Sequence, residues 1–503
     1  MAQHTTLLTP IRVLPESDLR GMSGFRITLI LFMVLSVAFL LFCFLLQLLP
    51  LSRWIMDWSF GASIAALTAT GTLAIMAGWP HLFDIRTFRL PGILVVGYLG
   101  MIVLPMPWVY ADFPNLARNN YVIVITLTLI CTLLGILAGN MIFYLPAHRI
   151  RQWMAAPAFH IPSLGILVFS LLVFCLLLLT IYILKIGTLP VISAIMGGSS
   201  KFELAQARED AFKLLDKSLR TPISYLRTML FPFATLMSLV LAIQTRRPIW
   251  RALFVVSLLG NLILAGATLE KSPVMALVIM IFATWLITGG WTVSPRVAIV
   301  IAVMGLAFPI FVVSANYGFS VDAQRLSQLL FRRIFYAPTE VILAYVDYFS
   351  GTAGFLWGRT LPYISKLLPG GPVWIENIIG LRYFYTGIDS INANGGYPAY
   401  LWADFGWFGV IVGGFVVGLI LQSIQVLVMR VPKSAPTIAL QSLLIWRTFM
   451  LTSASFGGWL DWAIWETAFA FVLWTLGNIR LRSARASSEI RGAPLLVLHK
   501  LDQ

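Results

Sequence analysis

The chain has 503 residues, of which 59% are hydrophobic and only 11% are charged. Soluble proteins contain about 25% charged residues, so this composition excludes a water-soluble globular fold. The formal net charge is +15. In so hydrophobic a chain, this charge indicates membrane topology and attraction to anionic lipid, and we expect no nucleic-acid partner.

Apolar segments of about 18–25 residues recur along the chain, and each is long enough to cross a bilayer as a helix. The sequence therefore predicts an all-α polytopic membrane protein, a single integral membrane domain over residues 1–503 with about twelve transmembrane helices. We expect the spans near residues 27–49, 58–79, 90–111, 121–145, 162–184, 222–244, 249–268, 273–291, 297–315, 407–429, 437–456 and 461–479.

The N-terminal segment 1–26 is polar, and no small-residue cleavage site follows the first apolar segment, so it does not resemble a signal peptide. Basic residues are concentrated in alternate short loops, which predicts that these loops face the cytoplasm. The N-terminal segment 1–26 and the tail 480–503 are then cytoplasmic as well. The basic residues of these inner loops are Arg86, Arg89, Arg149, Arg151, Arg246, Arg247, Arg251, Arg296, Arg430 and Lys433.

Two loops on the opposite side are long, near residues 185–221 and 316–406, and long loops in a compact bundle usually carry function. The first contains "KFELAQAREDAFKLLDKSLR", whose helical periodicity predicts an amphipathic helix lying in the membrane interface. The alternative interpretation adds a function, in which Arg208 and Arg220 face an anionic ligand.

The second long loop begins with "QRLSQLLFRRIFYAPTEVILAYVDYF". Arg333, Glu340 and Asp347 recur every seven residues, so on a continuous helix they share one stripe. This stripe is either a solvated face or a basic patch of Arg332 and Arg333 beside carboxylates. The rest of the loop is rich in Gly, Pro, Asn and aromatic residues, which suits carbohydrate binding and equally suits an ordinary irregular loop.

Charged residues within or next to apolar segments are costly in hydrocarbon and usually mark a site or a pathway. Lys271 lies in "TLEKSPV" between two spans, and Arg227 lies inside the sixth span. Arg447 and Glu466 form either a structural pair or one wall of a cavity for a lipid headgroup. Several cations in the outer half favour a phosphorylated lipid, because arginine matches phosphate oxygens.

The sequence contains no Walker loop, dinucleotide fingerprint, zinc signature or Asp-x-Asp pair. We therefore expect no metal and no cofactor. Any chemistry would use an activated substrate that is itself carried by the membrane.

Three stretches resemble one family. They are "LEKSPV", "FRRIFYAP" and "INANGGYPAYLWADFGWFGVIVGGFVVGL". With the overall layout of residues 25–480, they resemble the oligosaccharide repeat-unit polymerases, the Wzy-type O-antigen and exopolysaccharide polymerases of Gram-negative bacteria. The motifs are loose, and the clearest is the Asn…Gly-x-Pro…Asp-Phe-Gly approach to a helix.

This resemblance implies a GT-C-type glycosyltransferase in the bacterial inner membrane with a periplasmic active site. Such enzymes move a growing glycan from undecaprenyl diphosphate onto a new undecaprenyl-diphosphate-linked oligosaccharide, without metal or nucleotide. Membrane lipids, a flippase and a chain-length regulator are the partners that it implies.

On this resemblance, we expect the diphosphate to be held by cations and the sugars by a lip of the large loop. The catalytic candidates are Arg208, Lys271, Arg332, Arg333 and the carboxylate Glu340. The substrate-binding candidates are Arg220, Arg382, Asn392, Asn394, Tyr397, Trp402, Asp404 and Arg447. Small-residue contacts of the following span are expected at Gly409, Gly413, Gly414 and Gly418.

Two other functions remain open. A lipid-linked oligosaccharide flippase or other transporter would share the many spans and buried charges, but such proteins usually have two similar halves with short loops. An O-antigen ligase would share the layout, but we would expect a histidine in its large outer loop. All five histidines of this chain lie on the predicted inner side.

Overall fold

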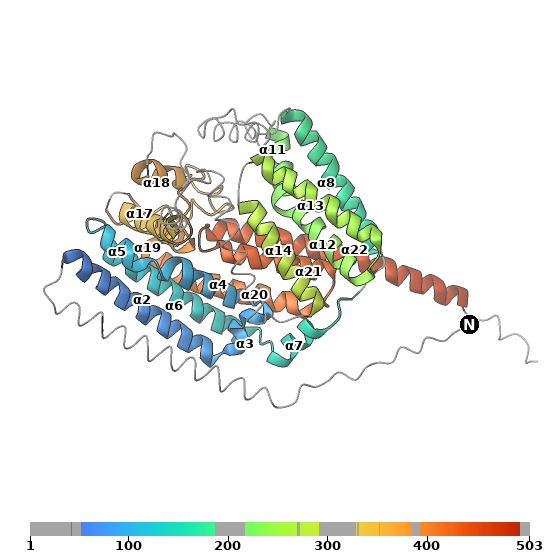
Figure 1. Cartoon of the computed structure of the whole chain (residues 1–503), viewed down its shortest axis with the longest axis horizontal. Coiled ribbons are helices and arrows are strands. Elements are labelled where there is room, and N and C mark those ends of the chain that lie inside the picture. The colour runs from blue at the N-terminus through green and yellow to red at the C-terminus, as the bar shows by residue number, and fades with distance from the viewer. Residues whose placement is uncertain are drawn as a thin grey trace, which may run out of the picture.

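The structure is a computed structural model, and its described residues form helices (Figure 1). Strand-like pairing within this part of the chain is confined to one bridge between Phe159 and Ser434. The described residues are 42, 52–159, 161, 163–186, 217–268, 272–290, 328, 331–351, 353–384 and 393–492.

The first half of the chain forms α2 (Arg53–Gly78), α3 (Pro80–Phe83), η1 (Ile85–Thr87), α4 (Leu90–Tyr98), η2 (Leu99–Val103), α5 (Met106–Asp112), α6 (Arg118–Ile142), α7 (Ala147–Ala155) and α8 (Leu164–Ile186). The middle forms α11 (Lys217–Tyr225), η3 (Leu226–Leu230), α12 (Phe231–Thr245), α13 (Pro248–Thr268), α14 (Ser272–Gly289), η4 (Arg332–Tyr336), α17 (Ala337–Gly351) and α18 (Ile375–Tyr383). The chain continues through α19 (Tyr397–Phe408), η5 (Gly409–Gly413), α20 (Gly414–Arg430), α21 (Ala435–Met450) and α22 (Phe456–Gly492).

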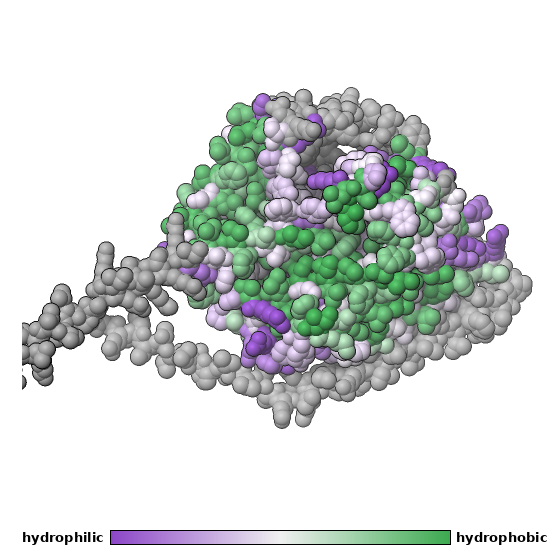
Figure 2. Space-filling view, turned by 180° about the vertical axis from the view of Figure 1, so that it is seen from behind, coloured by the Kyte–Doolittle hydropathy of each residue, from purple (hydrophilic) through white to green (hydrophobic). Residues whose placement is uncertain are grey.

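Within the described residues, seven helical stretches are long and apolar enough to cross a membrane. Helices occupy every predicted span except 27–49 and 297–315; apart from Phe42, these two spans lie outside the described residues. Figure 2 shows a broad apolar band with hydrophilic residues gathered along its upper and lower edges. The chain is therefore a multi-pass α-helical membrane protein, while the total of about twelve spans stays a prediction.

Two of the helical stretches contain a proline whose missing N–H determines a contact with another helix. Proline cannot donate to the carbonyl four residues earlier. Pro105 thus leaves the Met101 carbonyl without its helical donor, and the Thr339 hydroxyl donates to it at 2.8 Å. Pro232 leaves the Thr228 carbonyl in the same state, and Arg447 Nη2 donates to that oxygen at 2.8 Å. The widened π-type turns η2 and η3 precede these prolines.

Helices α6 and α20 approach each other closely because glycines face the partner backbone. A Cβ at Gly418 would lie 2.0 Å from the Thr132 carbonyl oxygen, and one at Gly414 would lie 3.1 Å from that of Thr128. On α6, a Cβ at Gly135 would lie 2.0 Å from the Phe415 carbonyl oxygen. The small-residue contacts expected of Gly414 and Gly418 therefore exist, and their partner is α6.

The chain folds back on itself at Gly406, which has a left-handed φ of +57°. As a result, α19 packs against η5, so that a Cβ at Gly409 would lie 2.0 Å from the Leu401 carbonyl oxygen. At the start of α19, the Tyr397 hydroxyl lies 3.0 Å from that of Thr132, near the middle of α6. Residues 397–405 thus form a short helix inside the bundle, although the sequence predicts a surface loop there.

The two ends of the bundle are held by different contacts between loops and helices. Helix α7 lies at the lower end in Figure 1. There the Lys433 ammonium donates to the carbonyl of Met154 in α7 and to that of Ala156 just after it, and Gln244 donates to the Ala158 carbonyl. These contacts bring together interhelical loops that the sequence predicts to lie on the same side of the membrane. At the upper end, α17 meets the start of α6, where the Ala117 amide donates to Asp347 at 2.9 Å.

Candidate functional site

A cavity of about 280 Å³ lies among η3, α12, α13, α14, α21 and α22. Two arginines, Arg227 and Arg447, line it together with Asn261. Three tryptophans, Trp446, Trp459 and Trp462, also line it, and most of the other lining residues are apolar. We call this space the arginine cavity.

The guanidinium of Arg447 is held on three sides. Its Nε donates to Glu466 Oε1 at 2.9 Å, and its Nη2 donates to the Thr228 carbonyl that Pro232 leaves without a helical donor. The Trp462 ring lies beneath it, with the guanidinium carbon 4.8 Å from the ring centroid. The sequence left open a structural pair or one wall of a cavity for a lipid headgroup. Arg447 pairs with Glu466 and also lines the arginine cavity, while binding of a lipid headgroup there stays a prediction.

Hydrogen-bond donors remain available at the arginine cavity. Arginine has five N–H groups, and Nη1 of Arg447 donates to no described residue. The buried indole N–H of Trp459 also lacks a hydrogen-bond partner in the part of the chain that the structure describes. Glu466 is completely buried and forms an ion pair with Arg447, and Arg227 is a second cation in the lining. This combination of cations and N–H donors suits an anionic group.

A second cluster of charged residues lies at the upper end, where η4 meets α5. The Tyr336 hydroxyl donates to Asp112 Oδ2 at 2.7 Å. Burial, followed by this bond, raises the pKa of Tyr336, so the phenol is a neutral donor. Glu340 lies one helical turn after Tyr336, and its carboxylate accepts no hydrogen bond from a described residue. Burial raises the pKa of Glu340, Arg332 lowers it and Asp112 raises it.

The structure does not bring all the predicted cations to one place. Arg332, Arg333 and Glu340 belong to η4 and α17, and none of them is among the described residues that line the arginine cavity. Arg447 lines that cavity. Arg208, Lys271 and Asn392 lie outside the described residues. The described part of the predicted site thus divides between the upper-end cluster and the arginine cavity.

The predicted sugar-facing lip is different in the structure. Tyr397, Trp402 and Asp404 are buried in the short helix α19, so their side chains do not form an exposed surface. Asp404 instead accepts hydrogen bonds from the hydroxyl and the amide of Thr360, at 2.5 and 3.2 Å. The physical reason is the reversal at Gly406, which places this segment inside the bundle.

The remaining candidates are exposed at separate places. Asn394 precedes α19, and Arg220 lies on α11. Arg382 lies on α18 with its guanidinium 5.2 Å from the centre of the Tyr348 ring. No described contact brings these three together at the arginine cavity.

Sequence reasoning missed several residues of both clusters. It noted Arg227 as a charge within a span but did not assign it to the site, and it did not consider the tryptophans next to Arg447. The signal was present in "IWRTF" and "GGWLDWAIWE", where aromatic residues recur beside the charges. Asp112 and Tyr336 gave no such signal, because they are far apart in sequence and meet only in the fold.

The fold and these two clusters define the class of protein, a multi-pass α-helical membrane protein with a cation-lined cavity in its bundle. Comparison with family models, with curated proteins and with solved structures finds no match to the chain.

Proposed function

We propose that this protein polymerises oligosaccharide repeat units carried on a polyprenyl diphosphate, as the Wzy-type polymerases do. In this proposal it is a metal-independent, GT-C-type glycosyltransferase that moves a growing glycan from undecaprenyl diphosphate to a new lipid-linked repeat. The arginine cavity holds the diphosphate. The product is a polysaccharide of the O-antigen, capsule or exopolysaccharide class.

The arginine cavity is the observation that carries this proposal. Ligand pockets usually have volumes of about 300–1,000 Å³, so a cavity of about 280 Å³ suits a headgroup and is too small for a whole lipid-linked oligosaccharide. Arginine forks match phosphate oxygens, and the tryptophan rings offer flat faces to the polyprenyl chain or the first sugar.

The transfer step needs little from the protein beyond positioning and charge. An acceptor hydroxyl oxygen bonds to the anomeric carbon while the bond from that carbon to the diphosphate oxygen breaks. The diphosphate leaves with the bonding electron pair, and Arg447 and Arg227 stabilise the charge that develops on it. The hydroxyl proton passes to a carboxylate. Glu340 lies outside the described cavity lining and keeps this role in our proposal, which therefore requires the substrate-bound protein to bring the upper-end cluster within hydrogen-bond reach of the acceptor hydroxyl.

We further propose that the lower end faces the cytoplasm of a bacterial inner membrane, and the upper end the periplasm. The basic connections at the lower end support this orientation. A flippase that delivers the repeats and a chain-length regulator are the proposed protein partners.

The test is elongation by the purified full-length protein in liposomes that contain lipid-linked repeats extracted from the source cells. We expect a ladder of products on a gel, and we expect it to persist in EDTA. Loss of the ladder in EDTA with recovery in magnesium would overturn the metal-free mechanism. Movement of the repeats across the bilayer without elongation would overturn the polymerase and favour a transporter.

Substitutions at Arg447 test the cavity itself. Removing a charge-assisted bond worth about 1.5–3 kcal/mol lowers the rate roughly 10- to 100-fold. We expect this loss in Arg447→Gln and only partial recovery in Arg447→Lys, because lysine cannot fork two oxygens. Arg430→Gln, at an exposed arginine in the last turn of α20, is the control and should keep full activity. A wild-type ladder from folded Arg447→Gln would overturn the assignment of the diphosphate to this cavity.

A further inference from the structure

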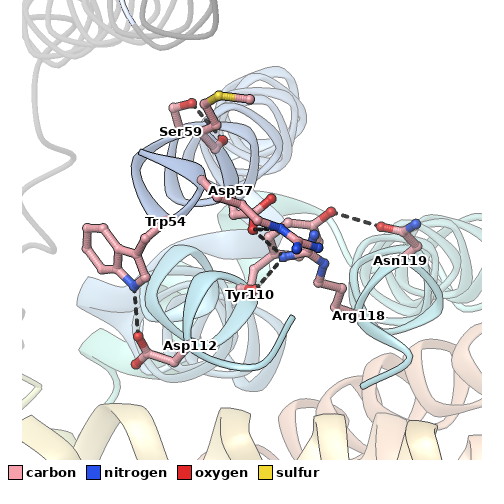
Figure 3. A network of polar contacts seen from close by, with 9 residues as sticks. Trp54, Asp57, Ser59, Tyr110, Asp112, Arg118 and Asn119 are labelled. Carbon is pink, nitrogen blue, oxygen red and sulfur yellow. Dashed lines mark hydrogen bonds and ion pairs between the residues drawn. The ribbon is translucent and has the colours of Figure 1, made fainter. Parts of the chain in front are cut away.

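A row of aromatic side chains crosses the upper end of the bundle. Trp54 lies in the first turn of α2, and its indole N–H donates to Asp112 Oδ1 at 3.0 Å (Figure 3). On its other oxygen, Asp112 accepts the hydrogen bond from Tyr336 of η4. One carboxylate thus fixes two rings from elements that are distant in sequence.

Two more rings come from the same elements, Trp108 from α5 and Phe331 from the residue before η4. Phe331 packs against Trp108 of α5 with ring centroids 5.6 Å apart and planes at 72°. Trp54 is 46% exposed and Phe331 is 36% exposed, so ring surface remains open to an outside ligand. We call Trp54, Trp108, Phe331 and Tyr336 the aromatic row.

Charged groups surround the aromatic row. Beside Trp54, Asp57 forms an ion pair with Arg118 at 2.7 Å, and this arginine lies over the Tyr110 ring (Figure 3). On the other side, Glu340 follows Tyr336 by one helical turn and keeps a carboxylate without a hydrogen bond to a described residue. A second carboxylate therefore lies near Asp112, which fixes the Trp54 and Tyr336 rings.

We infer that the aromatic row is a carbohydrate-binding subsite, in which pyranose rings lie on the Trp54 and Phe331 faces and Glu340 accepts hydrogen bonds from sugar hydroxyls. The inference rests on the proposed function in one respect, since it takes the growing glycan as the carbohydrate. It places the sugar-binding surface at α2, α5 and η4 instead of at the buried segment 397–404.

A lipid-facing aromatic belt is the competing explanation, because tryptophan and tyrosine gather at membrane interfaces. In such a belt, the indole N–H and the phenol O–H reach toward headgroups and water. In the aromatic row, the Trp54 indole N–H and the Tyr336 hydroxyl both donate to Asp112, which holds these two rings in fixed positions. Rings that are fixed before binding lose little entropy when a ligand stacks on them.

The experiment measures the binding of a soluble oligosaccharide to the full-length protein in detergent. The probe is the oligosaccharide released by mild acid from the lipid-linked repeats of the source cells, and saturation-transfer NMR gives its Kd. Stacking on an aromatic face is worth about 1 kcal/mol or more, so Trp54→Ala should weaken binding about fivefold or more.

Trp79→Ala is the matched control, because Trp79 directly follows the other end of α2 and is 42% exposed. Its affinity for the probe should equal that of the wild type. Tyr336→Phe is a second, milder test variant, because it removes only the hydroxyl that donates to Asp112 and keeps the ring. It should weaken binding of the probe by about twofold or more. Its control is Tyr383→Phe, which removes an equivalent 2.7 Å bond to Asp347 and should leave the affinity unchanged.

The outcomes separate this inference from the proposed function. Binding that is lost in Trp54→Ala, in a protein that does not elongate repeats, would support the subsite and overturn the polymerase. Elongation by the wild type, with equal affinities for the probe in Trp54→Ala and Trp79→Ala, would overturn the subsite alone. Absence of probe binding to the wild-type protein would also overturn the subsite.

Discussion

Glu340 combines partial burial with two charged neighbours, Arg332 and Asp112, and this combination determines how it titrates. Burial disfavours the carboxylate and raises its pKa above the ordinary 4.5, while Arg332 opposes the shift and Asp112 adds to it. A raised pKa means that the folded state is more stable with Glu340 protonated than with Glu340 ionised. Its contribution to stability is therefore present at low pH and is lost as the pH rises through the folded pKa.

The rate of elongation should depend on pH in the opposite direction from the stability, because Glu340 must be ionised to act as a base. We expect the rate of elongation to rise with pH along an acidic limb whose midpoint lies above 4.5. Arg332→Ala removes the charge that lowers this pKa, so the limb should move to higher pH. Arg86→Ala, at an exposed arginine of the lower end, should leave the limb in place. A pH–rate profile that is unchanged in both Arg332→Ala and Glu340→Gln would contradict the role of Glu340.

Two buried cations at the lower end differ in how well their donors are satisfied. Lys433 donates to two carbonyl oxygens, at 2.7 and 2.9 Å. Arg89 donates to the weak acceptor Met429 Sδ at 3.1 Å, while its Nε and Nη2 have no hydrogen-bond partner within the described residues. Burial lowers the pKa of both groups, to about 10 for Arg89 and to about 8 for Lys433.

Replacing each cation by methionine should therefore change stability in opposite directions. Lys433→Met leaves two buried carbonyls without a donor, at a cost of about 1–3 kcal/mol for each unsatisfied group. Arg89→Met removes a poorly satisfied buried charge and should be neutral or stabilising. The measurement is the midpoint of thermal unfolding of the purified protein in one detergent. A lower midpoint for Arg89→Met than for Lys433→Met would show that Arg89 has partners beyond those described.

At the scale of the elements, the contact between α6 and α20 depends on the absence of side chains. Gly418→Ala would place a methyl group 2.0 Å from the Thr132 carbonyl oxygen, which requires the helices to move apart. Overpacking of this kind costs about 1–3 kcal/mol. We expect a lower unfolding midpoint for Gly418→Ala.

The control is Gly71→Ala in α2, where an added Cβ meets nothing within 4 Å. Because alanine is better than glycine inside a helix by about 0.5–1 kcal/mol, this variant should unfold at the same or a higher temperature than the wild type. A Gly418→Ala midpoint equal to that of Gly71→Ala would contradict close packing of α6 on α20.

The helices could be predicted from hydropathy because each apolar run must satisfy its own backbone, and a helix does this with local hydrogen bonds. The segment 397–405 could not be predicted in this way. Its aromatic and polar residues are typical of a surface loop, and burial became possible only because Gly406 permits a reversal and Thr132 lies opposite Tyr397. Burial of this kind depends on residues that are distant in sequence.

The candidate site, too, could be predicted only where its contacts follow from the local sequence. Arg447 and Glu466 were paired from sequence because two opposite charges in neighbouring spans need each other. The Thr228 carbonyl accepts a hydrogen bond from Arg447 for two reasons. The missing N–H of Pro232 is visible in the local sequence, whereas the approach of η3 to α21 is a tertiary contact that the local sequence does not reveal. Of the two interpretations left open for Arg332 and Glu340, the basic patch beside a carboxylate agrees with the lowering of the Glu340 pKa by Arg332. Their separation from the arginine cavity depends on tertiary packing, because α17 packs on α19 and α6 while α21 packs on α12, α14 and α22.

For the whole molecule, the distribution of charge predicts which end faces the cytoplasm. The lower end gathers the basic connections, and the upper end carries α17 and α18 (Figure 1). Arg332 and Arg333 of η4 and Glu340 of α17 belong to this upper end. Positive charge is retained on the cytoplasmic side during insertion. The proposed reaction requires the upper-end cluster to face the periplasm, because the lipid-linked glycan is extended there.

Reporter insertions test this orientation. Gly371 lies between α17 and α18 with open space at its Cβ position, and Arg247 lies exposed between α12 and α13, so both positions should tolerate an insertion. We expect a phosphatase that folds only in the periplasm to be active at Gly371 and inactive at Arg247. A fluorescent protein that folds only in the cytoplasm should give the reverse result. Cytoplasmic signals from Gly371, with the insertion protein intact by immunoblot, would contradict both the periplasmic site and the polymerase.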